Sequence, residues 1–226
     1  MVRTICLLPL LAGTLVQASA DEVLLFSYFK GYLPVMEHEP HARNCWAPEI
    51  TYDPGENYWA TTIPGRFPET DAAGDNGYNH RLYYVTTRDF QKFSPTALLY
   101  EPGFNVIDAS IVNDGPRWVM FLKDETRYPP AKNIRVAFSD ALRGPWGPPS
   151  DPITRDYWAE GPSALKLGDK WIVYFDKCTR GTYGAVVSED LETWTDVSDR
   201  VSFPPGARHG TAFRVTRAEF ERIGLR

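Results

Sequence analysis

The stretch Gly161-Pro-Ser-Ala-Leu-Lys-Leu-Gly-Asp-Lys-Trp-Ile-Val-Tyr-Phe175 contains two short apolar segments separated by the turn residues Gly-Asp-Lys. Glycine and aspartate favour tight turns, whereas aromatic and β-branched residues favour strands. The stretch therefore predicts two antiparallel strands joined as a hairpin. A further apolar segment, Tyr183-Gly-Ala-Val-Val-Ser188, follows and extends the predicted sheet.

The same arrangement occurs twice earlier in the chain, over residues 47–90 and 108–140. Tyr58, Trp118 and Trp171 occupy equivalent places in the three copies, 60 and 53 residues apart. A repeat of this length with three or four antiparallel strands is typical of a propeller blade. We therefore predict an all-β propeller, with a β-sandwich as the alternative. The only segment with helical periodicity is Arg217 to Ile223.

A large aromatic residue follows the third strand of each copy, namely Phe90, Trp146 and Trp194. Aromatic side chains bury large apolar areas and commonly fill the space between packed sheets. We expect these three residues to pack between neighbouring blades.

The composition excludes several classes of protein. Hydrophobic residues make up 43% of the chain and aromatic residues 14%, which is typical of neither a disordered nor a fibrous protein. The formal net charge is −5, and no run of lysine and arginine could follow a phosphate backbone. We therefore expect no nucleic-acid partner.

The first twenty residues predict a secretory signal peptide. Arg3 supplies a positive charge, Ile5 to Val16 is mostly apolar, and Ala18-Ser19-Ala20 is a small-residue cleavage site. A membrane anchor is the alternative, but the apolar stretch is short for a hydrocarbon core about 30 Å thick. We expect residues 21–226 to form one domain that is secreted, extracellular or periplasmic, with no membrane partner.

Two cysteines, Cys45 and Cys178, lie outside the predicted signal peptide. In an oxidising compartment two cysteines can form a disulfide, but they can equally be buried thiols. Their spacing fits no zinc-binding pattern. The sequence leaves both alternatives open.

Acidic residues open the innermost strand of each predicted blade: Glu49, Asp108 and Glu160. The innermost strands of a propeller line its central channel, so we expect the three carboxyl groups to converge. His209 opens the last strand. The alternative is that each acid only binds the turn or strand edge beside it.

Two tryptophans, Trp46 and Trp158, lie beside these acids in the sequence. Desolvation by such neighbours raises the pKa of a carboxyl group, and a carboxyl that stays protonated can donate a proton to a leaving oxygen. Aromatic rings also complement the apolar faces of sugars. The pattern therefore favours chemistry on carbohydrates.

With these motifs the sequence resembles glycoside hydrolase family 43. The motifs occur in the order typical of that family: Asn44-Cys-Trp-Ala-Pro-Glu49, Asn105-Val-Ile-Asp108-Ala-Ser-Ile111, Tyr157-Trp-Ala-Glu160-Gly-Pro162 and Arg208-His209-Gly-Thr211. The resemblance implies an all-β fold of the five-bladed β-propeller type. It also implies inverting hydrolysis of arabinofuranosyl or xylosyl linkages in plant polysaccharides such as arabinan, arabinoxylan and xylan.

The resemblance further implies a role for each matching residue. Glu160 matches the general acid, and Asp108 matches the acid that orients it. The residues expected to bind substrate are Trp46, Glu49, Trp158, Arg208 and His209. No cofactor is required, although His209 matches a channel histidine that in some members contacts a central cation, often calcium.

The sequence departs from the family in the first blade. The family's general base is an Asp that precedes the Trp-Ala-Pro block, usually followed by Pro. Here Val23–Phe29 resembles the first strand, and Tyr32–Met36, which follows almost at once, resembles the end of that blade. We therefore expect an incomplete first blade without the base, with Glu49 as the best substitute and Asp21, Glu22, Glu37 or Glu39 as others.

Two alternatives follow from the expected loss of the base. One is a catalytically inactive propeller that binds carbohydrate through the same aromatic surface. The other is an internally deleted form that folds poorly, because a missing blade exposes strand edges.

Overall fold

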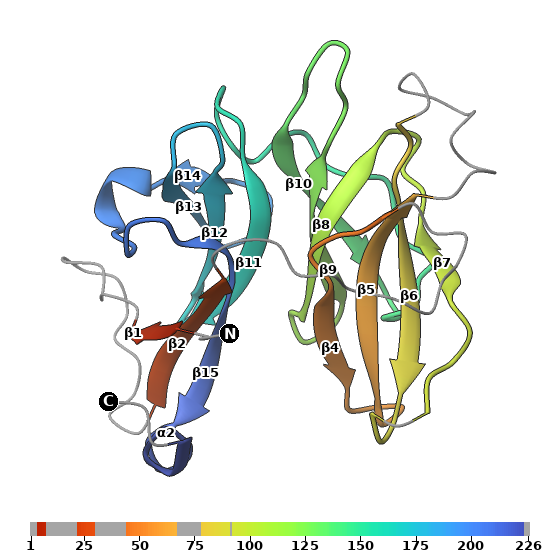
Figure 1. Cartoon of the computed structure of the whole chain (residues 1–226), viewed down its shortest axis with the longest axis horizontal. Helices are drawn as coiled ribbons and strands as arrows, with labels where there is room; N and C mark the ends of the chain where they lie inside the picture. Colours follow the sequence, from red (N-terminus) through yellow and green to blue (C-terminus); the bar gives the residue numbers. More distant parts are fainter. Residues whose placement is uncertain (1–3, 8–21, 30–43, 67–77, 91, 224–226) are drawn as a thin grey trace. The chain divides into compact units, whose positions relative to one another are not determined.

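The structure, a computed structural model, describes residues 4–7, 22–29, 44–66, 78–90 and 92–223 (Figure 1). The chain divides into two compact units. One consists of Leu33–Pro162, and the other of Met1–Tyr32 and Ser163–Arg226. We refer to them as the central unit and the terminal unit and describe each by itself.

The first sheet of the central unit is an antiparallel arrangement around one long strand. That strand, β5, pairs with β3, β4 and β6, and β6 in turn pairs with β7. The turn between β4 and β5 covers residues 54–57, where the sequence has Pro-Gly-Glu-Asn. These strands are β3 (Asn44–Cys45), β4 (Glu49–Asp53), β5 (Tyr58–Arg66), β6 (Arg81–Thr87) and β7 (Ala97–Tyr100).

The second sheet of the central unit is a three-stranded meander. Its strands are β8 (Val106–Asn113), β9 (Trp118–Asp124) and β10 (Asn133–Ser139). β9 lies in the middle and pairs antiparallel with both neighbours. β8 also contacts β4, β5 and β6, so the two sheets pack on one another.

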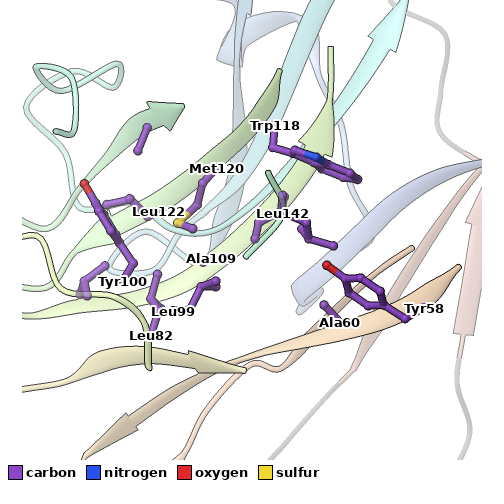
Figure 2. Close-up of a cluster of buried hydrophobic side chains, with 13 residues drawn as sticks. Tyr58, Ala60, Leu82, Leu99, Tyr100, Ala109, Trp118, Met120, Leu122 and Leu142 are labelled. Atoms are coloured by element: carbon purple, nitrogen blue, oxygen red, sulfur yellow. The ribbon is translucent and has the colours of Figure 1, made fainter. Parts of the chain in front are cut away.

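The core of the central unit lies where these two sheets meet. Figure 2 shows Tyr58 and Ala60 of β5 and Leu82 of β6 in one cluster with Met120 and Leu122 of β9. Met120 and Leu122 are fully buried. Burial of such side chains contributes about 25 cal/mol per Å² of apolar surface, so this cluster stabilises the positions of β8 and β9.

The terminal unit contains two further sheets. One is an antiparallel meander of β11 (Glu160–Leu167), β12 (Lys170–Lys177), β13 (Thr182–Ser188) and β14 (Thr195–Asp196). Residues 160–162, at the start of β11, belong to the central unit. The other joins β1 (Thr4–Leu7), β2 (Glu22–Phe29) and β15 (Arg208–Thr216). A 3-10 turn, η2 (Ser198–Arg200), contacts β13.

The helix expected near the end of the sequence is present as α2 (Arg217–Ile223). Its first turn is closed by a reciprocal cap, in which Glu219 N donates to Thr216 Oγ1 and Thr216 N donates to Glu219 Oε2. No other α-helix is formed by the described segments. Within them, no helix is long and apolar enough to cross a bilayer.

The all-β prediction and the three repeats are confirmed. Each copy is an antiparallel meander, and Tyr58, Trp118 and Trp171 are all buried. The prediction of packing between blades is wrong for Phe90, which is 51% exposed. Phe90 has a φ of +56° and donates its N–H to Thr87 Oγ1, so it belongs to a tight turn.

Several predictions lie outside the described residues. These include the signal-peptide cleavage site, the end of the first blade, Glu37 and Glu39, and the side chain of Cys45. The number of blades and the incomplete first blade therefore stay predictions, and both alternatives for Cys45 and Cys178 stay open.

One glycine of the terminal unit lies in close contact with its neighbours. A Cβ at Gly184 would stand 2.6 Å from Phe175 Cε2, Lys177 Cε and Ser198 Oγ. The Phe175 ring is fully buried and has little room to move. We expect Gly184→Ala to lower the free energy of unfolding by about 1–3 kcal/mol, measured by urea denaturation.

The matched control for this prediction is Gly55→Ala. Gly55 lies in an exposed turn, where the nearest atom to a new Cβ is 3.3 Å away. We expect a change within about 0.5 kcal/mol there. If both substitutions change the free energy of unfolding equally, the neighbours of Gly184 move aside without loss of stability, which would contradict the prediction.

Candidate active site

Glu160 is the first residue of β11 and belongs to the central unit. Its side chain is only 14% exposed, and its Oε2 accepts a hydrogen bond of 2.8 Å from Lys123 Nζ. Ala159, just before it, donates its N–H to Lys132 O at 2.9 Å. The bond from Lys123 therefore holds the Glu160 carboxyl, and the bond of Ala159 fixes the backbone just before it.

Asp108 lies in an irregular part of β8. Ile107 is opposite Lys123 and Ser110 is opposite Phe121, so Asp108 and Ala109 together face a single residue of β9. This is a β-bulge, and Asp108 has the positive φ of +51° that aspartate tolerates better than most residues. The bulge gives the Asp108 side chain an orientation that a regular strand would not provide.

The side chain of Asp108 is buried and binds the backbone beside Glu160. Its Oδ2 accepts a hydrogen bond of 3.0 Å from the N–H of Gly161. Gly161 itself has a φ of +56°, a conformation that glycine adopts without strain. The structure therefore brings Asp108 and Glu160 together, as the sequence predicts.

Lys123 lies between the carboxyl groups of the site. Its Nζ is 2.8 Å from Glu160 Oε2 and 2.7 Å from Glu125 Oε2. Burial lowers the pKa of Lys123, but the negative charges of Asp108, Glu160 and Glu125 outweigh it, so the pKa is raised above the usual value of a lysine. The ammonium therefore remains charged throughout the physiological range of pH.

A second lysine extends this cluster toward an exposed tryptophan. Lys132 Nζ forms an ion pair with Glu125 Oε1 and donates to Glu125 O. The same ammonium lies 5.7 Å from the centre of the Trp158 ring, a cation–π distance. Trp158 is 43% exposed, so its ring is available to a ligand beside Glu160.

A second aromatic surface forms around Trp46. The Trp46 ring is 38% exposed and stacks on the ring of His80 at 4.6 Å. The ring of Tyr78 meets His80 edge-on at 4.5 Å. Burial, followed by the charge of Glu125, raises the pKa of Tyr78, so the phenol is neutral.

His80 and Asn105 connect this surface to the charged cluster. His80 is fully buried, and its Nδ1 lies 3.0 Å from Asn105 Oδ1. Asn105 in turn accepts a hydrogen bond from Glu125 N and donates one to Glu125 O. Trp46 and Glu125 are therefore positioned by the same two residues.

Sequence reasoning identified Trp46, Asp108, Trp158 and Glu160 but missed the cluster that holds them. The missed residues are Tyr78, His80, Lys123, Glu125 and Lys132. A weak signal existed for His80, because it directly precedes a predicted strand in a chain with only 4 histidines. Lys123 and Glu125 carry no such signal, since charged residues at a strand end are usually solvated.

Glu49 opens β4, as predicted, and is half-buried. Its backbone pairs opposite Thr62 of β5. The bonds that fix Glu160 and Asp108 come from Lys123 and Gly161. A role for Glu49 as a substitute base therefore stays a prediction.

Arg208 and His209 belong to the terminal unit. Arg208 Nε forms an ion pair with Asp176 Oδ2 of β12, and the Asp176 side chain is almost fully buried. His209 has a φ of +36° and lies at a register irregularity between Arg208 and Gly210. Substrate binding by these two residues and calcium binding at His209 stay predictions.

A family model described as "Probable glycosyl hydrolase domain", related to glycoside hydrolase family 43, matches residues 16–221 of the chain. No curated protein sequence matches the chain. The family model covers every candidate residue named above.

Three solved structures resemble the chain at low sequence identity. A thermostable family-43 glycoside hydrolase has 16% identity and a TM-score of 0.60, over 89% of this chain and 81% of that one. RS223-β-xylosidase has 13% identity and a TM-score of 0.53, over 69% and 58%. A β-fructofuranosidase from Schwanniomyces occidentalis has 16% identity and a TM-score of 0.59, over 76% and 35%. At such identities the likeness shows the fold alone, which is β-propeller-like.

Proposed function

The chain belongs to the glycosyl hydrolase family related to family 43, and from this we propose that it hydrolyses arabinofuranosyl or xylosyl linkages in plant cell-wall polysaccharides, with inversion. That it is a glycosidase follows from the family. The linkage that is cleaved, the inversion at the anomeric carbon and the secretion of the chain are what we propose. Arabinan, arabinoxylan and xylan lie outside cells, which agrees with the signal peptide expected over residues 1–20.

The observation that supports the proposal most strongly is the way Glu160 is held. Its carboxyl is largely buried, receives a hydrogen bond from Lys123, and is followed by a peptide N–H bound to Asp108. A carboxyl fixed beside an exposed tryptophan is well suited to protonate the oxygen of a departing sugar. We assign Glu160 as the general acid and Asp108 as the residue that positions it.

The chemical step requires a second carboxylate. In an inverting glycosidase the proton passes from the acid to the glycosidic oxygen as the anomeric C–O bond breaks. Water attacks the opposite face of the sugar and gives its proton to a base about 6.5–9.5 Å from the acid. We propose Glu49 for this role in a propeller whose first blade is incomplete.

The substrate would bind through the exposed aromatic rings. Trp158 lies two residues before Glu160, and Trp46 is fixed by its stack on His80. Indole rings present flat apolar surfaces that complement the C–H faces of a sugar. One structural relative is a β-xylosidase, which agrees with a xylosyl substrate but does not decide between xylose and arabinose.

The test is hydrolysis of 4-nitrophenyl α-L-arabinofuranoside and β-D-xylopyranoside by the purified chain, with a β-D-galactopyranoside for comparison. We expect turnover of at least one pentoside and an inverted anomer as the first product, seen by NMR. Saturable binding of xylan or arabinan oligosaccharides without turnover would instead support the inactive carbohydrate-binding propeller. Turnover of the galactoside alone would overturn the assignment of the sugar.

A further inference from the structure

Lys123 is a buried cation near the end of a strand, which needs an explanation. It lies in β9 and is only 3% exposed. A buried ammonium is costly unless charged partners surround it. The groups that face it are Asp108 from β8, Glu160 from β11 and Glu125, which directly follows its own strand. Tyr78 is close enough that the charge of Lys123 affects the pKa of the phenol.

Of the two carboxyl groups that contact Lys123, that of Glu125 also contacts a second lysine. Glu125 has a second cation, Lys132, which binds its other carboxylate oxygen. Glu125 also accepts a bond from Lys132 Nζ at its backbone oxygen, 3.0 Å away. Lys132 can therefore balance the charge of Glu125 without Lys123. The carboxyl of Glu160, in contrast, is contacted by Lys123 itself, at 2.8 Å.

The charges of the cluster bear on which carboxyl group carries a proton. Two lysines, Lys123 and Lys132, face three carboxyl groups, those of Asp108, Glu125 and Glu160. The cluster is neutral when one of the three carboxyl groups carries a proton. Asp108 accepts a bond from Gly161 N, and Glu125 forms ion pairs with both lysines, so we assign the proton to Glu160.

We propose that Lys123 is a positioning residue for Glu160 that selects which carboxyl oxygen carries the transferable proton. This inference rests on the proposed role of Glu160 as general acid. An ammonium has three donors and no acceptor, so the oxygen it faces, Oε2, must act as an acceptor. The proton is therefore held on Oε1, and the carboxylate left after proton transfer is stabilised by the same ammonium.

The first test is kinetic and uses Lys123→Met, which removes the charge and keeps an unbranched side chain. With a poor leaving group, we expect kcat to fall about 10–100-fold with KM within about threefold, because a misplaced acid slows the chemical step. The alkaline limb of the profile of kcat/KM against pH should move toward higher pH, since the cation that favours the ionised acid is gone. Lys123→Arg, which keeps a charged donor, should recover part of kcat.

A second readout does not depend on activity. Crystal structures of the wild type and of Lys123→Met should show the Glu160 carboxyl displaced in the variant while the Asp108–Gly161 bond is kept. If the wild type shows no turnover, the proposed function fails, but this comparison still tests whether Lys123 positions Glu160. An unmoved Glu160, or an unchanged kcat and pH profile, would overturn the inference.

Two further variants serve as an alternative and as a control. If Lys123→Met does not fold, Lys123→Gln carries the same test, because it removes the charge but retains a polar side chain. Lys170→Met is the matched control, since Lys170 forms an ion pair of the same length, 2.8 Å, with the exposed Glu189. We expect that control to leave kcat and the pH profile unchanged, because exposed pairs contribute little.

Discussion

Glu160→Gln is expected to lower kcat about 10²–10⁴-fold for glycosides with poor leaving groups, with little change in the binding of oligosaccharides. The amide fills the same space as the carboxyl but has no proton to transfer. Its oxygen can still accept the bond from Lys123, so the local structure should persist. Steady-state kinetics with xylo- and arabino-oligosaccharides, and calorimetry for binding, measure the two quantities.

The nature of the leaving group separates acid catalysis from other roles of Glu160. A dinitrophenolate leaves without protonation, so the variant should retain much more of its activity on dinitrophenyl glycosides than on oligosaccharides. Glu189→Gln serves as the control, because Glu189 is an exposed glutamate paired with Lys170. Equal losses on both kinds of substrate would contradict the assignment of Glu160 as the general acid.

Asp108→Ala is expected to lower the free energy of unfolding by about 2–4 kcal/mol. Two effects add at this residue. The N–H of Gly161 loses its acceptor, and alanine tolerates the φ of +51° less well than aspartate does. Urea denaturation of the variant and the wild type gives the difference.

Two other variants separate these effects. Asp108→Asn keeps an acceptor oxygen and a residue suited to positive φ, so we expect a smaller loss, below about 1.5 kcal/mol. Asn57→Ala serves as the comparison for the backbone effect, because Asn57 has a φ of +52° in an exposed turn. The bond that its side chain accepts from Tyr52 OH is exposed and contributes little. If Asp108→Ala costs no more than Asn57→Ala, the bond to Gly161 does not stabilise the fold.

The strands and hairpins could be predicted because their signals are local. The Asp-Pro-Gly, Asp-Gly-Pro and Gly-Asp-Lys segments mark turns, and the apolar residues beside them mark the strands that the structure shows. Trp118 and Trp171, which occupy equivalent places in the repeats, are both buried in the middle strands of their meanders. Phe90 was mispredicted, since a tight turn can direct a large apolar side chain into solvent.

The charged cluster could not be predicted from the sequence because burial is decided by distant segments. Lys123 stands next to Asp124 and Glu125, a pattern that usually marks a solvated strand end. The carboxyl groups that surround Lys123 in the fold come from Asp108 of β8 and Glu160 at the start of β11. These residues lie 15 and 37 positions away in the sequence. His80 is likewise fixed by Asn105, 25 residues further along the chain.

The extra residue in β8 has a consequence for how relatives of this chain can be judged. The antiparallel pairing of β8 and β9 continues on both sides of the bulge, so the sheet itself does not depend on the extra residue. A homologous sequence shortened by one position at this point could preserve its architecture and yet lose the acid that holds Gly161. We therefore expect the length of this segment to distinguish relatives that retain the proposed catalytic arrangement from those that keep only the fold.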